Sequence, residues 1–115
     1  MDITIDELSG VTVIRLNGAL DARAAPLVRE HLSRLLAAGA TRFVIDGGQL
    51  GFVDSTGLGT LIFLRRTARQ RKGDLCIAAP GRDLLQVLDF SGMDQVFSVV
   101  PDVPAAVTKL TAPAA

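Results

Sequence analysis

Residues 52–59 (FVDSTGLG) place a carboxylate, two hydroxyl groups and two glycines where an apolar strand pattern changes into an apolar helix pattern. The first backbone N–H groups of a helix have no partner inside the helix, and they attract anions. A phosphate on one of these hydroxyl groups would add about −1.5 to −2 charges beside Asp54. The turn therefore predicts a surface whose charge can be switched.

The same residues are also good helix caps. Asp, Ser and Thr are preferred at the N-cap, and Gly57 and Gly59 allow close packing of a helix. For Asp54, Ser55 and Thr56 taken alone, capping is the better explanation.

Asp21 is the second carboxylate of interest. Pro26 suits the first turn of a helix, which places the cap at Ala24 or Ala25. Asp21 is then too early in the chain to cap this helix, and its carboxylate needs another explanation. If the strands before Asp21 and Asp54 are parallel, both acids lie at one edge of the sheet.

Hydrophobic periodicity predicts the elements that position these residues. Alternation over residues 3–6 and 11–16 predicts a β-hairpin, the apolar runs 43–45 and 75–79 predict buried strands, and residues 96–100 predict an edge strand. Helices are expected from Pro26 to the stop at Gly39, from the turn at residue 54 to the stop at Gly73, after residues 80–81, and over residues 101–110. Residues 47–52 are expected to form a loop.

The chain of 115 residues is long enough for one domain. A hairpin followed by strand–helix units predicts an α/β fold, with a mixed sheet of four to five strands, the later ones mostly parallel, packed with four helices. We expect residues 1–110 to form this domain and residues 111–115 to form a disordered tail.

Composition excludes several classes of partner. A net charge of zero argues against nucleic acid and membrane surfaces. No apolar run approaches the roughly 20 residues that span a bilayer, and no signal-peptide pattern is present. The single cysteine, Cys76, is expected to be an inert core thiol in a reducing compartment, so we predict a cytoplasmic protein.

Enzymatic and metal-binding patterns are weak. Val53 stands where a Gly-x-Ser-x-Gly nucleophile motif needs glycine, and no P-loop is present. His31 lies within a helix and is expected to be solvated rather than a base for Ser55. Asp21 and Asp54 lack a third ligand for a cation. We therefore predict no catalytic residue, no metal and no cofactor.

The second helix carries an apolar run at 61–64 and a basic cluster at 65–72. The basic cluster is most simply a solvated helix face, and a partner-docking role is the alternative. Four successive apolar residues cover more than one helix face, which leaves partner contact or weak homodimerisation through this helix open.

Three motifs in order resemble those of STAS domains (sulphate transporter and anti-sigma factor antagonist). They are residues 17–21 (NGALD) with 25–29 (APLVR), residues 44–46 (VID) with 52–59 (FVDSTGLG), and residues 88–93 (LDFSGM). The resemblance covers about residues 3–110, and it implies a STAS-like fold.

In stand-alone members that this chain resembles, the serine after the aspartate is phosphorylated by an anti-sigma factor with serine-kinase activity. That position is Ser55, with Thr56 as the less favoured acceptor. The resemblance implies that the unphosphorylated protein binds the anti-sigma factor and releases a sigma factor, and that a serine phosphatase resets the cycle. Asp21 matches the acid needed for kinase engagement. The implied site for partner binding and kinase recognition is Asp21, Asp54, Ser55, Thr56, Gly57, Leu58 and Gly59.

The chain departs from the family pattern at a few positions. Ala19 stands where Glu is common, and Ala24 stands where Ser or Thr often caps the first helix, at a cost of about 1 kcal/mol. Residues 47–48 (GG) are looser than the usual end of this strand. Two alternatives remain open: a STAS scaffold or transporter-associated subunit that docks a partner through the same turn, and a small nucleotide-binding or hydrolytic protein. The absence of a phosphate-cradling lysine counts against the second.

Overall fold

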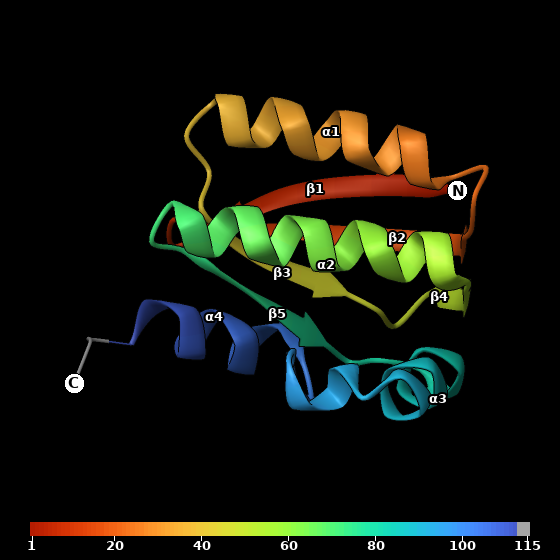
Figure 1. Cartoon of the computed structure of the whole chain (residues 1–115). Helices are drawn as coiled ribbons and strands as arrows, with labels where there is room; N and C mark the ends of the chain where they lie inside the picture. Colours follow the sequence, from red (N-terminus) through yellow and green to blue (C-terminus); the bar gives the residue numbers. More distant parts are fainter. Residues whose placement is uncertain (113–115) are drawn as a thin grey trace.

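Six strands form one sheet, with four α-helices and a short 3-10 helix around it, in the computed structural model, which describes residues 1–112 (Figure 1). The elements are β1 (Asp2–Leu8), β2 (Val11–Leu20), α1 (Ala25–Ala37), β3 (Arg42–Asp46), β4 (Leu50–Val53), α2 (Ser55–Gln70), β5 (Asp74–Ala78), α3 (Arg82–Ser91), η1 (Met93–Gln95), β6 (Ser98–Val100) and α4 (Val103–Thr111). The mixed α/β fold with four helices is as predicted. The expected number of strands, four to five, is wrong, because β4 lies in the predicted loop.

The strand order is β1-β2-β3-β5-β6, and β4 also pairs with β2. The hairpin β1–β2 is antiparallel and all other pairs are parallel. β2 is long enough to serve two partners in succession: residues 12–15 pair with β3, and residues 18–20 pair with β4. β6 lies at the sheet edge, as expected.

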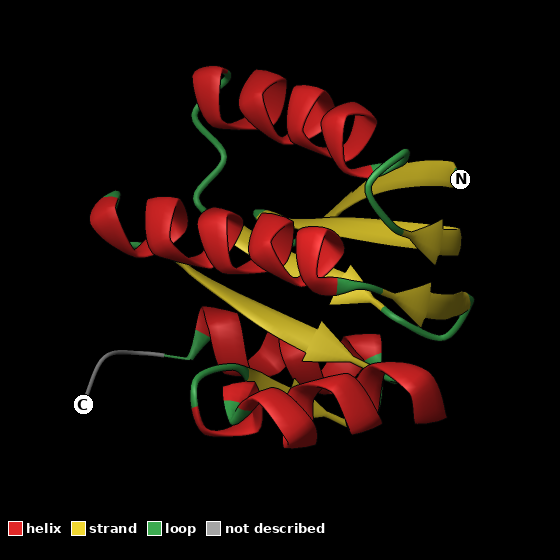
Figure 2. Ribbon diagram, turned by 45° about the vertical axis from the view of Figure 1, so that its right-hand side comes forward, coloured by secondary structure: helices red, strands yellow, loops and turns green. Residues whose placement is uncertain are grey.

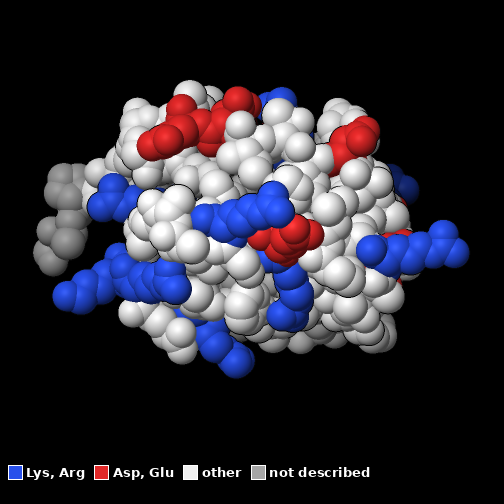
Figure 3. Space-filling model, turned by 90° about the horizontal axis from the view of Figure 1, so that it is seen from above, with Lys and Arg blue, Asp and Glu red and all other residues white. Residues whose placement is uncertain are grey.

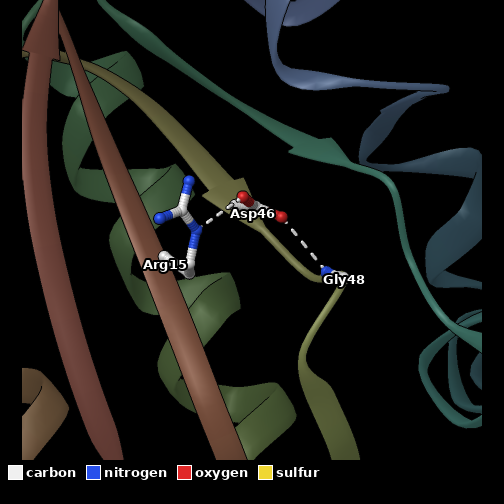
Figure 4. A network of polar contacts seen from close by, with 3 residues as sticks. All are labelled: Arg15, Asp46 and Gly48. Atoms are coloured by element: carbon white, nitrogen blue, oxygen red, sulfur yellow. Dashed lines mark hydrogen bonds and ion pairs between the residues drawn. The ribbon is translucent and has the colours of Figure 1, made fainter.

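The turn between β3 and β4 is held by Asp46 (Figure 4). One carboxylate oxygen of Asp46 accepts a bond of 3.0 Å from Nε of Arg15 on β2, and the other accepts the backbone N–H of Gly48 at 3.1 Å. These contacts direct the chain back alongside β2. Leu50 and Val53 are then buried, while Gly51 and Phe52 are exposed.

Helices lie on both sides of the sheet (Figure 2), and the buried residues form two hydrophobic clusters. α1 and α2 lie over one face, and Leu84 and Leu88 of α3 complete the same core. α4 covers the other face, where Ala106 packs with Val13 and Cys76. Cys76 is buried as predicted, and burial raises the pKa of its thiol.

The helix ends show how local residues set the boundaries. α1 stops before Gly39, which has a φ of +99°, as predicted. After α2 the left-handed residue is Lys72 rather than Gly73, and Gly73 is needed because a Cβ there would overlap the carbonyl oxygen of Thr41.

α4 continues to Thr111, one residue into the expected tail of residues 111–115. Residues 113–115 of that predicted tail lie outside the described residues. Within residues 1–112, no helix combines the length and the apolar character that crossing a membrane requires.

Candidate functional site

Asp21 and Asp54 leave the sheet side by side. β2 and β4 are parallel neighbours, with Leu20 opposite Val53, so each acid is the first residue after its strand. The backbone N–H of Asp54 donates to the carbonyl oxygen of Leu20 at 3.3 Å. The two acids share one sheet edge, as the parallel topology predicts, and the strand that carries Asp54 is β4.

Asp54 joins the two chain segments that meet at this edge. One carboxylate oxygen accepts the N–H of Gly57 at 2.8 Å and caps α2. The other accepts the N–H of Ala22 at 3.1 Å, in the turn that leads to α1. The expected capping role is confirmed, and the same side chain also fixes α2 relative to the end of β2.

Asp21 holds the turn before α1. Its Oδ1 accepts the N–H groups of Arg23 at 3.0 Å and Ala24 at 3.1 Å, and its carbonyl oxygen accepts the N–H of Ala25 at 2.9 Å. The N-cap of α1 is Ala24, which has no side-chain cap. Asp21 is too early in the chain to cap α1, as the sequence predicts, and its carboxylate instead closes the turn of residues 21–24 ahead of the helix.

The two glycines of the turn have different roles. A Cβ on Gly57 would overlap the carbonyl oxygen of Leu20, so the absence of a side chain lets α2 contact the end of β2. A Cβ on Gly59 would meet nothing within 4 Å. Leu58 is only 8% exposed and belongs to the main core. Gly57 and Leu58 thus position the turn, whereas Gly59 has no packing requirement.

Ser55 and Thr56 are exposed in the first turn of α2. Among the hydrogen bonds of residues 1–112, neither hydroxyl group takes part in one, so no base is bonded to Ser55, and His31 lies on α1. Residues 1–112 also contain no group of three or more His, Cys, Asp or Glu side chains arranged to share a metal ion. The Ser55 hydroxyl is therefore open to an incoming protein, and its modification would break no bond of the cap.

A groove beside Ser55 was not found from the sequence. It has a volume of about 460 Å³ between β4, α2 and α3, and its walls include Phe52, Ser55, Val87 and Phe90. Phe90 is 97% exposed and Phe52 is 52% exposed. The sequence feature that could have indicated this groove is Phe90, a large apolar residue that falls outside the buried face of α3.

The rim around Ser55 is acidic. Asp83, in the first turn of α3, lines the same groove as Ser55 and Asp54. On the other side of the edge, Asp21 lines a shallow hollow together with Ala19, Leu27 and the basic side chain of Arg23. A phosphate on Ser55 would thus add negative charge to a surface that already carries three carboxylates.

Most of the apolar run 61–64 packs against the core or against Arg29. Leu61 and Leu64 are fully buried, Ile62 packs against the core, and Phe63 is stacked by the guanidinium of Arg29 at 4.7 Å from the ring centre. Phe63 remains 36% exposed and Ile62 is half-buried, so part of this run stays at the surface.

Comparison with known proteins agrees with this architecture. The model of the STAS domain matches residues 2–106. The anti-sigma F factor antagonist of Paenibacillus polymyxa is 24% identical over 111 residues, covering 96% of this chain and 95% of that protein. The solved structure of the anti-sigma factor antagonist SpoIIAA in its unphosphorylated form superposes with a TM-score of 0.85 at 23% identity, covering 99% of this chain and 100% of that one.

SpoIIAA from Bacillus in its phosphorylated form is also similar, with a TM-score of 0.75 at 24% identity and coverage of 94% and 98%. The match to the family model extends over nearly the whole chain and includes the turn at residues 54–57 and both acids. This chain belongs to the STAS domain family.

Proposed function

We propose that this protein is an anti-sigma factor antagonist that binds an anti-sigma factor through the surface around Ser55. The observation that carries the proposal is the exposed hydroxyl of Ser55 at the start of α2, directly after the capping residue Asp54 and at the same sheet edge as Asp21; within residues 1–112 this hydroxyl makes no hydrogen bond. The name of the Paenibacillus relative supports the class of function. The groove between Phe52 and Phe90 supplies an apolar docking area next to the switch.

Phosphorylation of Ser55 would change the charge of this surface without unfolding it. The cap uses the side chain of Asp54, not the hydroxyl of Ser55, and a phosphate at a helix N-terminus is favoured by the helix dipole. The added charge of about −1.5 to −2 lies beside Asp54 and Asp83 and repels any partner shaped for the neutral serine. The protein then acts as a substrate of a serine kinase and of a phosphatase, and as a binding module rather than an enzyme.

Intact-mass measurement after incubation with ATP and the anti-sigma kinases of the same organism tests this proposal. We expect one phosphate on the wild type and on Thr56→Val, and none on Ser55→Ala. A phosphate that persists on Ser55→Ala would move the acceptor to Thr56. If no such kinase binds or modifies the protein, the anti-sigma proposal is wrong, and a docking scaffold with the same surface becomes the better explanation.

A binding measurement with the modifying kinase completes the test. Phosphorylated protein should bind at least tenfold more weakly than unmodified protein, which corresponds to about 1.4 kcal/mol. Equal affinity of the two forms would show that Ser55 does not control docking.

A further inference from the structure

A second groove continues along α2 from the one beside Ser55. It has a volume of about 680 Å³, and α2 and the η1 region form its walls. Ser55 and Leu58 line the first groove, and Ile62, Arg65 and Arg69 line the second at helical spacing along the same flank. Ser91 borders the first groove and Met93 borders the second, so the two hollows lie end to end.

The second groove combines an apolar floor with free positive charge. Ile62, Met93 and Val96 supply the apolar part. Arg69 pairs with Asp74 at 3.2 Å, whereas Arg65 and Arg66 have no ion pair within the part of the chain that the structure describes.

The helix dipole accounts for only part of this charge. Basic side chains stabilise the last turn of a helix, and α2 ends at Gln70, which explains Arg69. Arg65 and Arg66 lie one turn earlier, where this effect has faded. Figure 3 shows basic side chains along its lower left and further ones at its centre and right, while acidic side chains lie along the upper edge and at the centre.

We propose that this basic groove binds an acidic amphipathic segment of a partner protein. Its carboxylates would pair with Arg65 and Arg66, and its apolar side chains would cover Ile62 and Met93. We refer to the residues Ile62, Arg65, Arg66, Arg69, Gln70, Met93 and Val96 as the basic groove. The site does not depend on phosphorylation of Ser55.

The composition of the groove favours a protein segment over other anions. Proteins that bind single-stranded nucleic acid use aromatic side chains to stack bases, and no aromatic residue lines the basic groove. The net charge of the whole chain is zero, which gives little general attraction for a polyanion or an anionic membrane. A recessed apolar floor with two free guanidinium groups instead matches one helix or strand with acidic and apolar sides.

Titration of the full-length 15N-labelled protein with designed peptides tests the proposal. The probe is an end-blocked helical peptide with leucine on one face and glutamate on the other, and its control carries lysine in place of every glutamate. We expect amide shifts at Ile62, Arg65, Arg66, Met93 and Val96 with the glutamate peptide only.

The affinity of variants for the glutamate peptide gives a quantitative test. R65E combined with R66E should weaken binding of the glutamate peptide at least tenfold. R42E, a single charge reversal at an exposed arginine on β3 outside both grooves, should change it less than twofold, and R65E alone is the variant of equal charge change to compare with it. Circular dichroism of each variant checks that the fold is kept, and Ile62→Ala provides a second variant that removes apolar contact without changing charge.

Several results would overturn the proposal. If no amide shifts occur in the basic groove, or if both peptides bind equally well, charge complementarity does not explain binding. Equal binding of oligothymidylate would show a simple anion patch, and stronger binding of phosphatidylglycerol vesicles would point to a membrane. Concentration-dependent shifts at the same residues without peptide would assign the groove to a second copy of this chain. Because none of these measurements uses a kinase, failure here leaves the proposal for Ser55 intact.

Discussion

Asp54 needs both of its carboxylate oxygens. One accepts the N–H of Gly57 and the other accepts the N–H of Ala22, so a single side chain holds the start of α2 against the turn after β2. Asparagine has one oxygen and an NH₂ group, and it can satisfy only one of these donors. The second donor would face another donor.

Asp54→Asn should therefore lower the free energy of unfolding by about 1–2 kcal/mol, from one lost bond and one unsatisfied N–H. Asp102→Asn is the matched control, because Asp102 caps α4 with a single bond to the N–H of Ala105 at 2.8 Å. Asparagine caps about as well as aspartate in that case. Urea unfolding of both variants measures the difference, and equal losses would contradict the double role of Asp54.

Alanine substitutions at the two glycines that flank Leu58 should change stability in opposite directions. Alanine is favoured over glycine in a helix by about 1 kcal/mol, so Gly59→Ala, with open space around it, should raise stability by up to about this amount. Gly57→Ala should lower stability, because the new methyl group overlaps the carbonyl oxygen of Leu20 and forces α2 away from β2. Thermal unfolding of the two variants decides the matter, and shifts of the same sign would be incompatible with the close contact at Gly57.

Among the helices and strands, those features are predictable that depend only on residues adjacent in the sequence. The helix start at 54–57 and the stop at Gly39 depend on local turn chemistry, and both are observed. β4 escaped prediction because it has only four residues and its two central residues, Gly51 and Phe52, are both exposed, which breaks the period-two pattern. Its strand character comes from pairing with β2, some thirty residues away in the chain.

The contribution of Asp21 was missed for a related reason. Its position is indeed too early to cap α1, but an aspartate side chain can also bond to N–H groups two and three residues later and so form a turn. The turn of residues 21–24 brings those groups to the carboxylate. The groove at Phe90 likewise depends on how α3 packs beside β4, and this packing cannot be predicted from the local sequence.

α3 offers a test that separates docking from folding. Phe90 is 97% exposed, so Phe90→Ala should change the free energy of unfolding by less than about 0.5 kcal/mol. If the groove beside Ser55 holds the anti-sigma factor, the same variant should weaken that complex at least tenfold, as exposed aromatic anchors do.

Leu85→Ala is the matched control for Phe90. Leu85 is also exposed on α3, but it lines a different hollow, with Phe97 and Val99. Isothermal titration calorimetry should show nearly unchanged affinity for this variant. Equal effects of the two substitutions, or none from Phe90→Ala, would remove the groove from the docking surface.

For the whole molecule, the sheet divides two cores of unequal size, and α4 alone covers the smaller one. Cys76 lies in this smaller core with Val44 and Ala106. The chain has no tyrosine, and Cys76 is its only cysteine. The stability of the fold above neutral pH should therefore report on the burial of one thiol.

Burial raises the pKa of Cys76 above its ordinary value of 9.0, with Lys109 opposing and Asp74 assisting the shift. The folded protein then keeps the thiol proton at a pH where the unfolded chain has lost it, so stability must fall as pH rises above the unfolded pKa. We expect the free energy of unfolding of the wild type to decline as pH rises above the ordinary thiol pKa of 9.0, by at most about 1.4 kcal/mol per pH unit. Cys76→Ala loses packing at every pH but lacks this thiol, so the decline in its free energy of unfolding should be shallower.

Urea unfolding of both proteins across this pH range measures the two slopes. Parallel curves would show that Cys76 is not shielded as the structure requires. Rapid reaction of the native protein with a thiol reagent at pH 8 would show the same.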